Sequence, residues 1–316
     1  MFQAQQLVFY SCVSPVHMGA GQAVGAIDNP IQREVHTGHP LISGSGLKGA
    51  VRHHFVRTWT DKHLITHIFG PDRGASEHAG AIAFTDAALV AFPVRSLRNT
   101  FVYATCPSAL GRLKRLAGEQ APWRVDQVPV GSVKTASSGA DSAIVNGRLI
   151  LEAFDFAAAE DANVKAIATW LADHALPHGD DHQFFRDKLK VDLVVLSDTE
   201  FDHFVRHATV VEAHVKIDPD TGTAVKGALF YTENLPPESL LAGLVLASVE
   251  RTKGKDPKDL KDAAWMLNAV LRDGDGEDKE RHGLADRMLQ VGGDATTGRG
   301  LIVVHPSGKV TNGTNA

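Results

Sequence analysis

The most informative part of this chain runs from Gly25 to Arg52 and reads GAIDNPIQREVHTGHPLISGSGLKGAVR. It begins with a loop that carries one aspartate, Asp28, and ends with a glycine- and serine-rich turn that opens into a helix. A carboxylate held close to a phosphate-binding element suggests nuclease chemistry. An aspartate before Asn-Pro is also a good turn former, so the residues alone leave a structural role for Asp28 open.

The helix that follows this turn is suited to binding phosphate. Ser45 is a plausible N-cap, and apolar residues recur at helical spacing from there to about Lys62. A helix N-terminus presents free backbone N–H groups and the positive end of its dipole, and both attract anions. Lys48 and Arg52 lie on one helical face, because residues four apart are neighbours there. The sequence therefore predicts that this helix contacts a polyanion.

A predicted strand and a predicted hairpin accompany this region. Residues 6–14 are rich in β-branched and aromatic residues, which is typical of a strand, and a long glycine-rich loop follows over 15–44. Residues 209–217 and 224–231 flank the turn sequence DPDTG at 218–222, which predicts a β-hairpin.

The other elements show no βαβ rhythm and no internal repeat, which indicates an α+β fold. We expect a hairpin over 80–94, strands over 96–104, 148–156, 191–196, 240–249 and 300–305, and helices over 107–117, 161–174, 184–189, 198–206 (capped by Asp198) and 257–271.

Composition narrows the class of protein. With 316 residues, 43% hydrophobic and 22% charged, the chain is typical of a globular protein with a full core. Two cysteines, Cys12 and Cys106, fit a reducing cytoplasm, and we expect neither a signal peptide nor a membrane span. The net charge of −5 argues mildly against nucleic-acid binding. A basic track is still possible, because five basic residues and no acid lie between Arg95 and Arg115.

Two further patterns point to sites only weakly. The glycine-rich run from Gly293 to Gly300 resembles a P-loop, but it lacks the Lys-Ser/Thr pair and leads into a strand. A tight turn and an RNA-contacting loop are about equally open there. His63 and His67 lie one helical turn apart, as in zinc proteases, yet Leu64 stands where the glutamate belongs. Such spacings are common by chance among sixteen histidines, so we do not expect a zinc site.

Taken in order, several segments resemble the RAMP superfamily of CRISPR-associated proteins. More narrowly, they resemble the repeated backbone subunit of type III-B (Cmr) effector complexes. The segments are HMGAG at 17–21, IDNPIQRE at 27–34, SGSGLKGAVR at 43–52, FTDAALVAFPVRS at 84–96, YATCPSALGRL at 103–113, the hairpin with its end at 217–236, and GG…TGRG at 292–300. The family usually has a proline where this chain has Ser43, and often a second serine where it has Gly46.

The resemblance implies a single domain over residues 1–316 with a ferredoxin-like, RRM-type core and large insertions. The expected additions are an insertion at 118–147, a thumb-like hairpin at 209–231 and a helical insertion with an acidic loop at 250–283. Such subunits polymerise along a CRISPR RNA, contact other Cmr subunits and cleave the paired target RNA at six-nucleotide intervals. No membrane is implied as a partner.

The resemblance also assigns residues. Asp28 matches the family's catalytic aspartate and is expected to bind a divalent cation, Mg²⁺ or Mn²⁺, or to act as the base in attack by the target's 2′-OH. Apolar residues of the thumb are expected to wedge between bases: Val210, Val211, Leu229 and Phe230. Residues expected to contact RNA are His17, Arg33, Ser43, Gly44, Ser45, Lys48, Arg52, Arg95, Gly293, Thr297 and Arg299.

Two alternatives remain at this point. The chain could be a non-catalytic RAMP subunit that caps a type III complex, in which case Asp28 is a turn residue. It could also be a RAMP endoribonuclease that processes CRISPR RNA, which would need a histidine-centred site; His17 and the pair His36 and His39 keep this alternative open.

Overall fold

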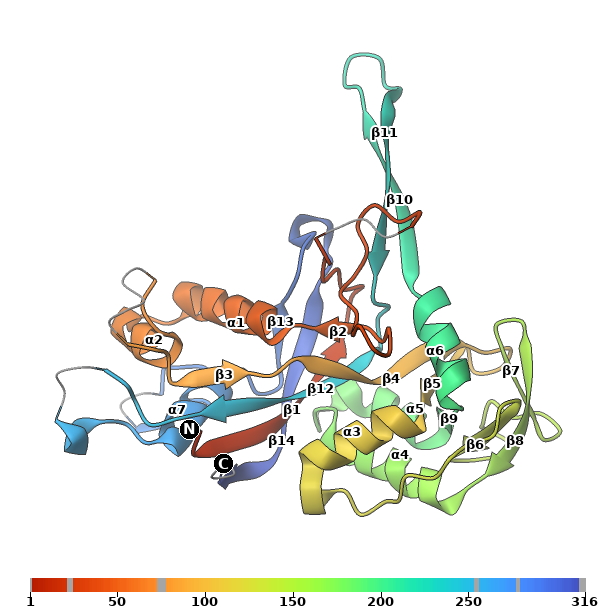
Figure 1. Cartoon of the computed structure of the whole chain (residues 1–316), viewed down its shortest axis with the longest axis horizontal. Helices are drawn as coiled ribbons and strands as arrows, with labels where there is room; N and C mark the ends of the chain where they lie inside the picture. Colours follow the sequence, from red (N-terminus) through yellow and green to blue (C-terminus); the bar gives the residue numbers. More distant parts are fainter. Residues whose placement is uncertain (1, 22–24, 73–77, 253–255, 277–278, 313–316) are drawn as a thin grey trace.

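A large mixed β-sheet forms the centre of the molecule (Figure 1). The computed structural model describes residues 2–21, 25–72, 78–252, 256–276 and 279–312. The strands of the sheet are β1 (Ala4–Cys12), β2 (Leu41–Ile42), β3 (Ile82–Phe84), β4 (Ala87–Arg95), β5 (Phe101–Thr105), β6 (Ser132–Thr135), β7 (Arg148–Leu151), β8 (Phe154–Glu160), β9 (Leu193–Val195), β12 (Leu240–Ala247), β13 (Arg287–Gln290) and β14 (Leu301–Asn312).

The strand order is β13-β14-β1-β12-β4-β5-β9-β6-β8-β7, with β2 paired to β4 and β3 paired to β12. Most of these pairs are antiparallel, whereas β5–β9 and β6–β8 are parallel. The helices that pack on the sheet are α1 (Gly44–Thr58), α2 (Lys62–Phe69), α3 (Pro107–Ala117), α4 (Ala162–His174), α5 (Gln183–Asp192), α6 (Asp198–His207) and α7 (Ala263–Leu271). Short 3₁₀ turns are η1 (Gly118–Gln120), η2 (Asp180–His182), η3 (Pro257–Asp259) and η5 (Ala295–Thr297). The α+β class predicted from the sequence is confirmed.

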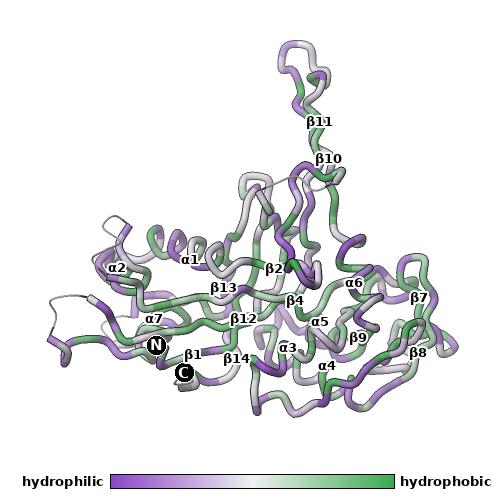
Figure 2. The backbone as a smooth tube through the Cα atoms, viewed as in Figure 1, coloured by the Kyte–Doolittle hydropathy of each residue, from purple (hydrophilic) through white to green (hydrophobic). Residues whose placement is uncertain are grey.

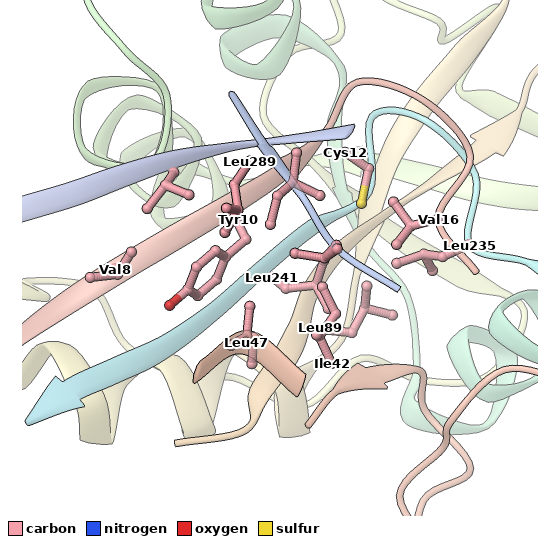
Figure 3. Packing of buried hydrophobic residues seen from close by; sticks show 14 of the residues in the cluster. Val8, Tyr10, Cys12, Val16, Ile42, Leu47, Leu89, Leu235, Leu241 and Leu289 are labelled. Atoms are coloured by element: carbon pink, nitrogen blue, oxygen red, sulfur yellow. The ribbon is translucent and has the colours of Figure 1, made fainter. Parts of the chain in front are cut away.

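Strand β1 divides the core into two layers, because successive side chains of a strand point to opposite faces. Val8, Tyr10 and Cys12 belong to a cluster that includes the buried faces of α1, α2 and α7. Leu7 and Phe9 belong to a second cluster on the other face, with α3, α4 and α5. Figure 3 shows the first layer, and Figure 2 shows that hydrophobic segments concentrate in the central strands. This alternation buries β1 on both sides and fixes its register.

A two-stranded hairpin, β10 (Val210–Ile217) and β11 (Ala224–Asn234), stands out from the body (Figure 1). Its turn is closed by Asp218, whose Oδ1 accepts hydrogen bonds from the backbone N–H groups of Asp220 and Thr221. Val211, Leu229 and Phe230 are 48%, 56% and 40% exposed, so the hairpin carries apolar side chains that are not buried in this chain. The predicted hairpin is confirmed, and β11 continues three residues further than expected, to Asn234.

The helix predicted from Ser45 to Lys62 differs at both ends. Its N-cap is Ser43, whose Oγ accepts the N–H of Gly46, and it ends at Thr58. A second helix, α2, starts after Asp61, whose carboxylate accepts the N–H of Leu64. The apolar pattern continues across this break because both helices bury their faces in the same cluster.

Two other predictions are wrong. Residues 80–94 do not form a hairpin, because β3 and β4 each pair with β12 instead of with each other. Helix α6 is capped by Ser197, whose Oγ accepts the N–H of Glu200. Asp198, the expected cap, accepts the N–H of Ser108 at the start of α3.

The segments expected as insertions contribute to the core. Residues 118–147 supply β6 and the buried side chains of Trp123 and Val128. Residues 250–283 supply α7, which begins at Ala263, later than the predicted 257. Within the described part of the chain, no helix combines the length and apolar character needed to cross a membrane.

Candidate functional site

Asp28 lies at the root of the hairpin, bonded to β11. Its Oδ2 accepts the backbone N–H of Tyr231 at 2.8 Å. The next residue, Asn29, donates its N–H to Tyr231 O at 3.0 Å and accepts the N–H of Glu233 at 2.9 Å. The loop therefore forms a parallel β-bridge with β11, in which Asn29 lies opposite Thr232. Asp28 is exposed, and its Oδ1 accepts no hydrogen bond from any described residue, so one carboxylate oxygen faces outward.

His17 is anchored to the same part of β11. Its Nδ1 lies 2.7 Å from the carbonyl oxygen of Glu233. Because a carbonyl oxygen only accepts hydrogen bonds, Nδ1 carries the proton here, and in the neutral ring Nε2 is left as the acceptor. The bridge between Val16 and Leu235 holds the backbone beside this contact. The structure thus brings a carboxylate and an imidazole to residues 231–233.

The glycine-rich segment 292–300 packs against the backbone of His17. Gly293 donates its N–H to His17 O at 2.9 Å. Gly292 has φ +72°, and a Cβ there would lie 2.1 Å from His17 O, so only glycine fits at this position. Thr297 closes its own turn by donating to Asp294 O. Arg299 forms an ion pair of 2.5 Å with Glu212 of β10. This segment is a tight turn that is fastened both to His17 and to the hairpin.

Gln32 links the Asp28 loop to the start of α1. Its Oε1 accepts the N–H of Ser43, and its Nε2 donates to Gly19 O. Within the first turn of α1, Gly44 donates its N–H to Asp86 and Gly46 donates to the Ser43 side chain. The free donor of this turn among the described residues is the N–H of Ser45. The helix start is therefore largely satisfied within the chain, and the remaining backbone donor belongs to the exposed Ser45.

Lys48 and Arg52 follow on the same helix. The Lys48 ammonium donates to Ile82 O at 3.1 Å, and Arg52 pairs at 2.7 Å with the exposed Asp72. Burial lowers the pKa of Lys48, and the positive charges of Arg52 and Arg251 lower it further. Both cations already have a partner within the chain, and their contact with a polyanion stays a prediction.

Arg33 and Arg95 differ from the other predicted RNA contacts. Both terminal nitrogens of Arg33 are bonded within the chain, to carbonyl oxygens of Gly38 and Val205 and to the carboxylate of Glu233. Arg95 pairs with Glu152 at 2.9 Å and lines a separate hollow of about 490 Å³. Contact of these two residues with RNA stays a prediction, and for Arg33 the structure shows an internal structural role.

Glu233 was missed from the sequence because the predicted hairpin stopped at residue 231. Its side chain is buried and accepts hydrogen bonds from Ile31 N, Thr209 Oγ1 and Arg33 Nη2. The local sequence hinted at this role only in that an acidic residue lies where β11 continues into the protein body.

The site offers few protein ligands to a metal ion. Across the described ranges, no three His, Cys, Asp or Glu side chains are placed to hold one. The outward-facing Oδ1 of Asp28 is a hard oxygen donor of the kind that Mg²⁺ prefers. A divalent ion fits here if RNA and water oxygens complete its coordination.

Comparison with known proteins gives a consistent result. The family model described as RAMP superfamily matches residues 9–303. The chain is 30% identical over 315 residues to the CRISPR system Cmr endoribonuclease Cmr4 of Pyrococcus furiosus, covering 97% of both proteins. It is 23% identical over 312 residues to the CRISPR system CMR subunit Cmr4 of Saccharolobus solfataricus, covering 93% of this chain and 94% of that protein.

Solved structures show the same fold. Oligomeric Cmr4 from Pyrococcus furiosus superposes with a TM-score of 0.69 at 25% identity, covering 99% of this chain and 100% of that one. A chain of the type III-B Cmr-beta complex bound to cognate target RNA superposes with a TM-score of 0.70 at 20% identity, covering 96% and 98%.

Proposed function

The chain belongs to the RAMP superfamily and, within it, to the Cmr4 family, and we propose that it is the RNA-cleaving backbone subunit of a type III-B CRISPR effector complex. The observation that carries this proposal is the convergence of Asp28 and His17 on residues 231–233 at the hairpin root. It is supported by a relative that is named an endoribonuclease and that this chain matches over 97% of its length.

The proposed reaction is attack of the target's own 2′-OH on the neighbouring phosphate. The 2′-oxygen forms a bond to phosphorus and the bond from phosphorus to the 5′-oxygen breaks. The attacking hydroxyl loses a proton and the leaving oxygen gains one. His17 can move a proton at Nε2, since its Nδ1 is engaged by Glu233 O.

Asp28 is the proposed holder of a divalent cation, Mg²⁺ or Mn²⁺, through Oδ1. When bound, such an ion would neutralise charge at the phosphate. Asp28 is held from behind by Tyr231 N–H, so its carboxylate can approach a phosphodiester without a change in the loop. The alternative role for Asp28 is that of the base at the attacking hydroxyl, and cleavage that persists in EDTA would favour it.

The rest of the site is proposed to hold RNA. Lys48, Arg52 and the N–H of Ser45 would contact guide phosphates, and the glycine-rich segment would let the RNA backbone pass close to His17. The hairpin would act as a thumb: its exposed apolar residues are suited to wedging between bases, so that a displaced nucleotide aligns its 2′-OH with the leaving oxygen. Guide pairing, and not base reading by the protein, would give target specificity.

The proposed setting is a cytoplasmic complex in which several copies line one CRISPR RNA beside other Cmr subunits. The solved relatives are described as oligomeric Cmr4 and as Cmr-beta with cognate target RNA. The sheet with its packed helices is proposed to be an elaborated ferredoxin-like, RRM-type core.

The test is cleavage of guide-matched RNA by the assembled complex. We expect products spaced by six nucleotides with Mg²⁺ or Mn²⁺, none with EDTA, and 5′-hydroxyl ends on the downstream fragments. Scrambled target RNA is the control. Absence of cleavage at any metal concentration would support the non-catalytic alternative, and cutting of unpaired CRISPR RNA by the isolated chain would support the processing alternative.

A further inference from the structure

Glu233 occupies the junction between the Asp28 loop and both strands of the hairpin. The residue is 2% exposed. Its Oε2 accepts the N–H of Ile31 at 3.0 Å, and its Oε1 accepts Thr209 Oγ1 at 2.8 Å and Arg33 Nη2 at 2.5 Å. Its backbone N–H donates to Asn29 O, and its carbonyl oxygen accepts a hydrogen bond from His17 Nδ1. One residue of β11 is thus bonded to both segments that carry the candidate catalytic groups.

Arg33 completes this junction from the opposite direction. Its Nη1 donates to the carbonyl oxygens of Gly38, at 2.8 Å, and of Val205, at 2.9 Å. Val205 lies in the last turn of α6, immediately before β10, so Arg33 ties its loop to the root of one hairpin strand. Through Glu233 it ties the loop to the root of the other. The pair therefore fastens the Asp28 loop to the hairpin at two points.

We infer that Arg33 and Glu233 form a positioning pair that holds Asp28 and His17 in register with the hairpin and transmits the hairpin's position to them. The inference rests on the proposed function. Neither residue touches the reacting atoms in this account. They act through Asp28 and His17.

Stability alone is a poor explanation for this pair. Removing two charges from water carries a penalty that their attraction often only balances, and apolar residues of similar size are frequently as stable. The Asp28 segment has no helix or strand of its own, so its order depends on such contacts. A reacting group that moves by about 1 Å can lose roughly 100-fold in rate. The pair, in which the Arg33 side chain is 20% and the Glu233 side chain 3% exposed, restrains this loop through hydrogen bonds at both partners.

The test uses assembled complexes carrying Glu233→Gln. The amide keeps the size and the acceptor oxygen, but its NH₂ group and lost charge weaken the bond to Arg33. We expect single-turnover cleavage at saturating target to fall by about 100-fold. Guide content and target Kd should remain within about twofold of the wild type, because no predicted RNA phosphate contact is removed.

A second variant and a control make the result specific. Arg33→Lys keeps the charge opposite Glu233 but loses the fork that reaches Val205 O, so we expect an intermediate cleavage rate. Asp192→Asn breaks the ion pair between Asp192 and Lys188, whose side chains are 4% and 8% exposed. This pair contacts neither the Asp28 loop nor the segment that carries His17. The Asp192→Asn variant should cut like the wild type.

Four outcomes would overturn the inference. They are wild-type cutting by Glu233→Gln, failure of both Glu233→Gln and Arg33→Lys to assemble, an equal loss in Asp192→Asn, and a loss of target affinity that accounts for the loss of rate. Asp28→Asn, measured alongside, separates the two claims. If it is inactive while Glu233→Gln cuts normally, only the positioning role fails, and if both cut normally, the proposed function fails as well.

Discussion

Asp28 owes its position to the backbone of β11 more than to its own loop. One carboxylate oxygen is taken by Tyr231 N–H, while Asn29 on its C-terminal side is bonded to β11 in both directions. The other oxygen faces outward. Since an asparagine keeps one acceptor oxygen for Tyr231 N–H, Asp28→Asn removes the charge with little change in the loop. This makes it a cleaner probe than an alanine.

Behind the Asp28 loop lies a second polar cluster whose charges depend on pH. Burial lowers the pKa of His39, and the charge of Arg112 lowers it further. Burial alone would raise the pKa of Glu34, but hydrogen bonds from Thr37 and Arg112 outweigh it and lower the pKa. Arg112 donates to Glu34 and to Nδ1 of His39, so a neutral His39 and an ionised Glu34 belong to the folded state.

These shifts predict a loss of stability in acid. The unfolded chain binds a proton on His39 near its ordinary pKa of 6.5, whereas the folded chain does not. The free energy of unfolding should therefore be highest above that pH and should decrease as the pH falls below it. Glu34 should add a second loss below about pH 4.5. We expect His39→Gln, in urea unfolding between pH 7 and 5, to lose less than the wild type. The exposed His36→Gln is the control, and equal losses in all three proteins would contradict the assignment.

In helix α1, the local sequence pattern predicts that a helix forms, and tertiary contacts determine where it begins. The apolar spacing predicted a helix here, and a helix is present. The sequence predicted Ser45 as the N-cap, whereas the cap in the structure is Ser43. Gly44 bonds to Asp86, and a Cβ on Gly44 would lie 2.1 Å from Phe84 O, so the helix starts earlier than predicted.

For α1 we predict a salt-dependent role in RNA binding. Lys48→Ala should weaken binding to any guide sequence and reduce the slope of log K against log salt by roughly 0.7 for each phosphate that is no longer neutralised. Arg52→Ala should add a similar change. The matched control is Arg57→Ala, an exposed cation in the last turn of the same helix. Unchanged affinity and slope in the Lys48, Arg52 double variant would refute the contact.

The strands show where sequence reasoning stops. β1 and the hairpin were predictable because β-branched and aromatic content and the turn at 218–222 are local signals. The hairpin over 80–94 was wrong because both β3 and β4 take their partner from β12, about 150 residues away. No local pattern contains that partner. Strand β6 was missed for the same reason, since its neighbours β8 and β9 come later in the chain.

At the scale of the whole molecule, the site is assembled from four segments that are distant in sequence. These are the segment after β1 with His17, the Asp28 loop, the root of β11, and the glycine-rich segment before β14. The resemblance to a known family pointed to Asp28, His17 and Gly293 together. It did not point to Glu233, because an ion pair between residues 200 positions apart leaves no mark in either local sequence.

The hairpin and the site form one unit in this arrangement. The side-chain hydrogen bonds of Asp28 and His17 both end on β11, and Arg299 of the glycine-rich segment pairs with β10. If the hairpin engages RNA on a neighbouring copy, the catalytic groups are placed by that engagement. Cleavage is therefore expected from the assembled complex and not from the isolated chain.

The measurement that tests the central claim most directly is single-turnover cleavage of guide-matched RNA by complexes assembled with Asp28→Asn, with target Kd determined on the same preparation. We predict target binding within about twofold of the wild type and a cleavage rate lower by roughly 10²–10⁴-fold, the range for a lost acid–base group, or more if a metal ion is lost with it. Cleavage at the wild-type rate by an intact complex would show that Asp28 is a turn residue and that the RNA is cut elsewhere.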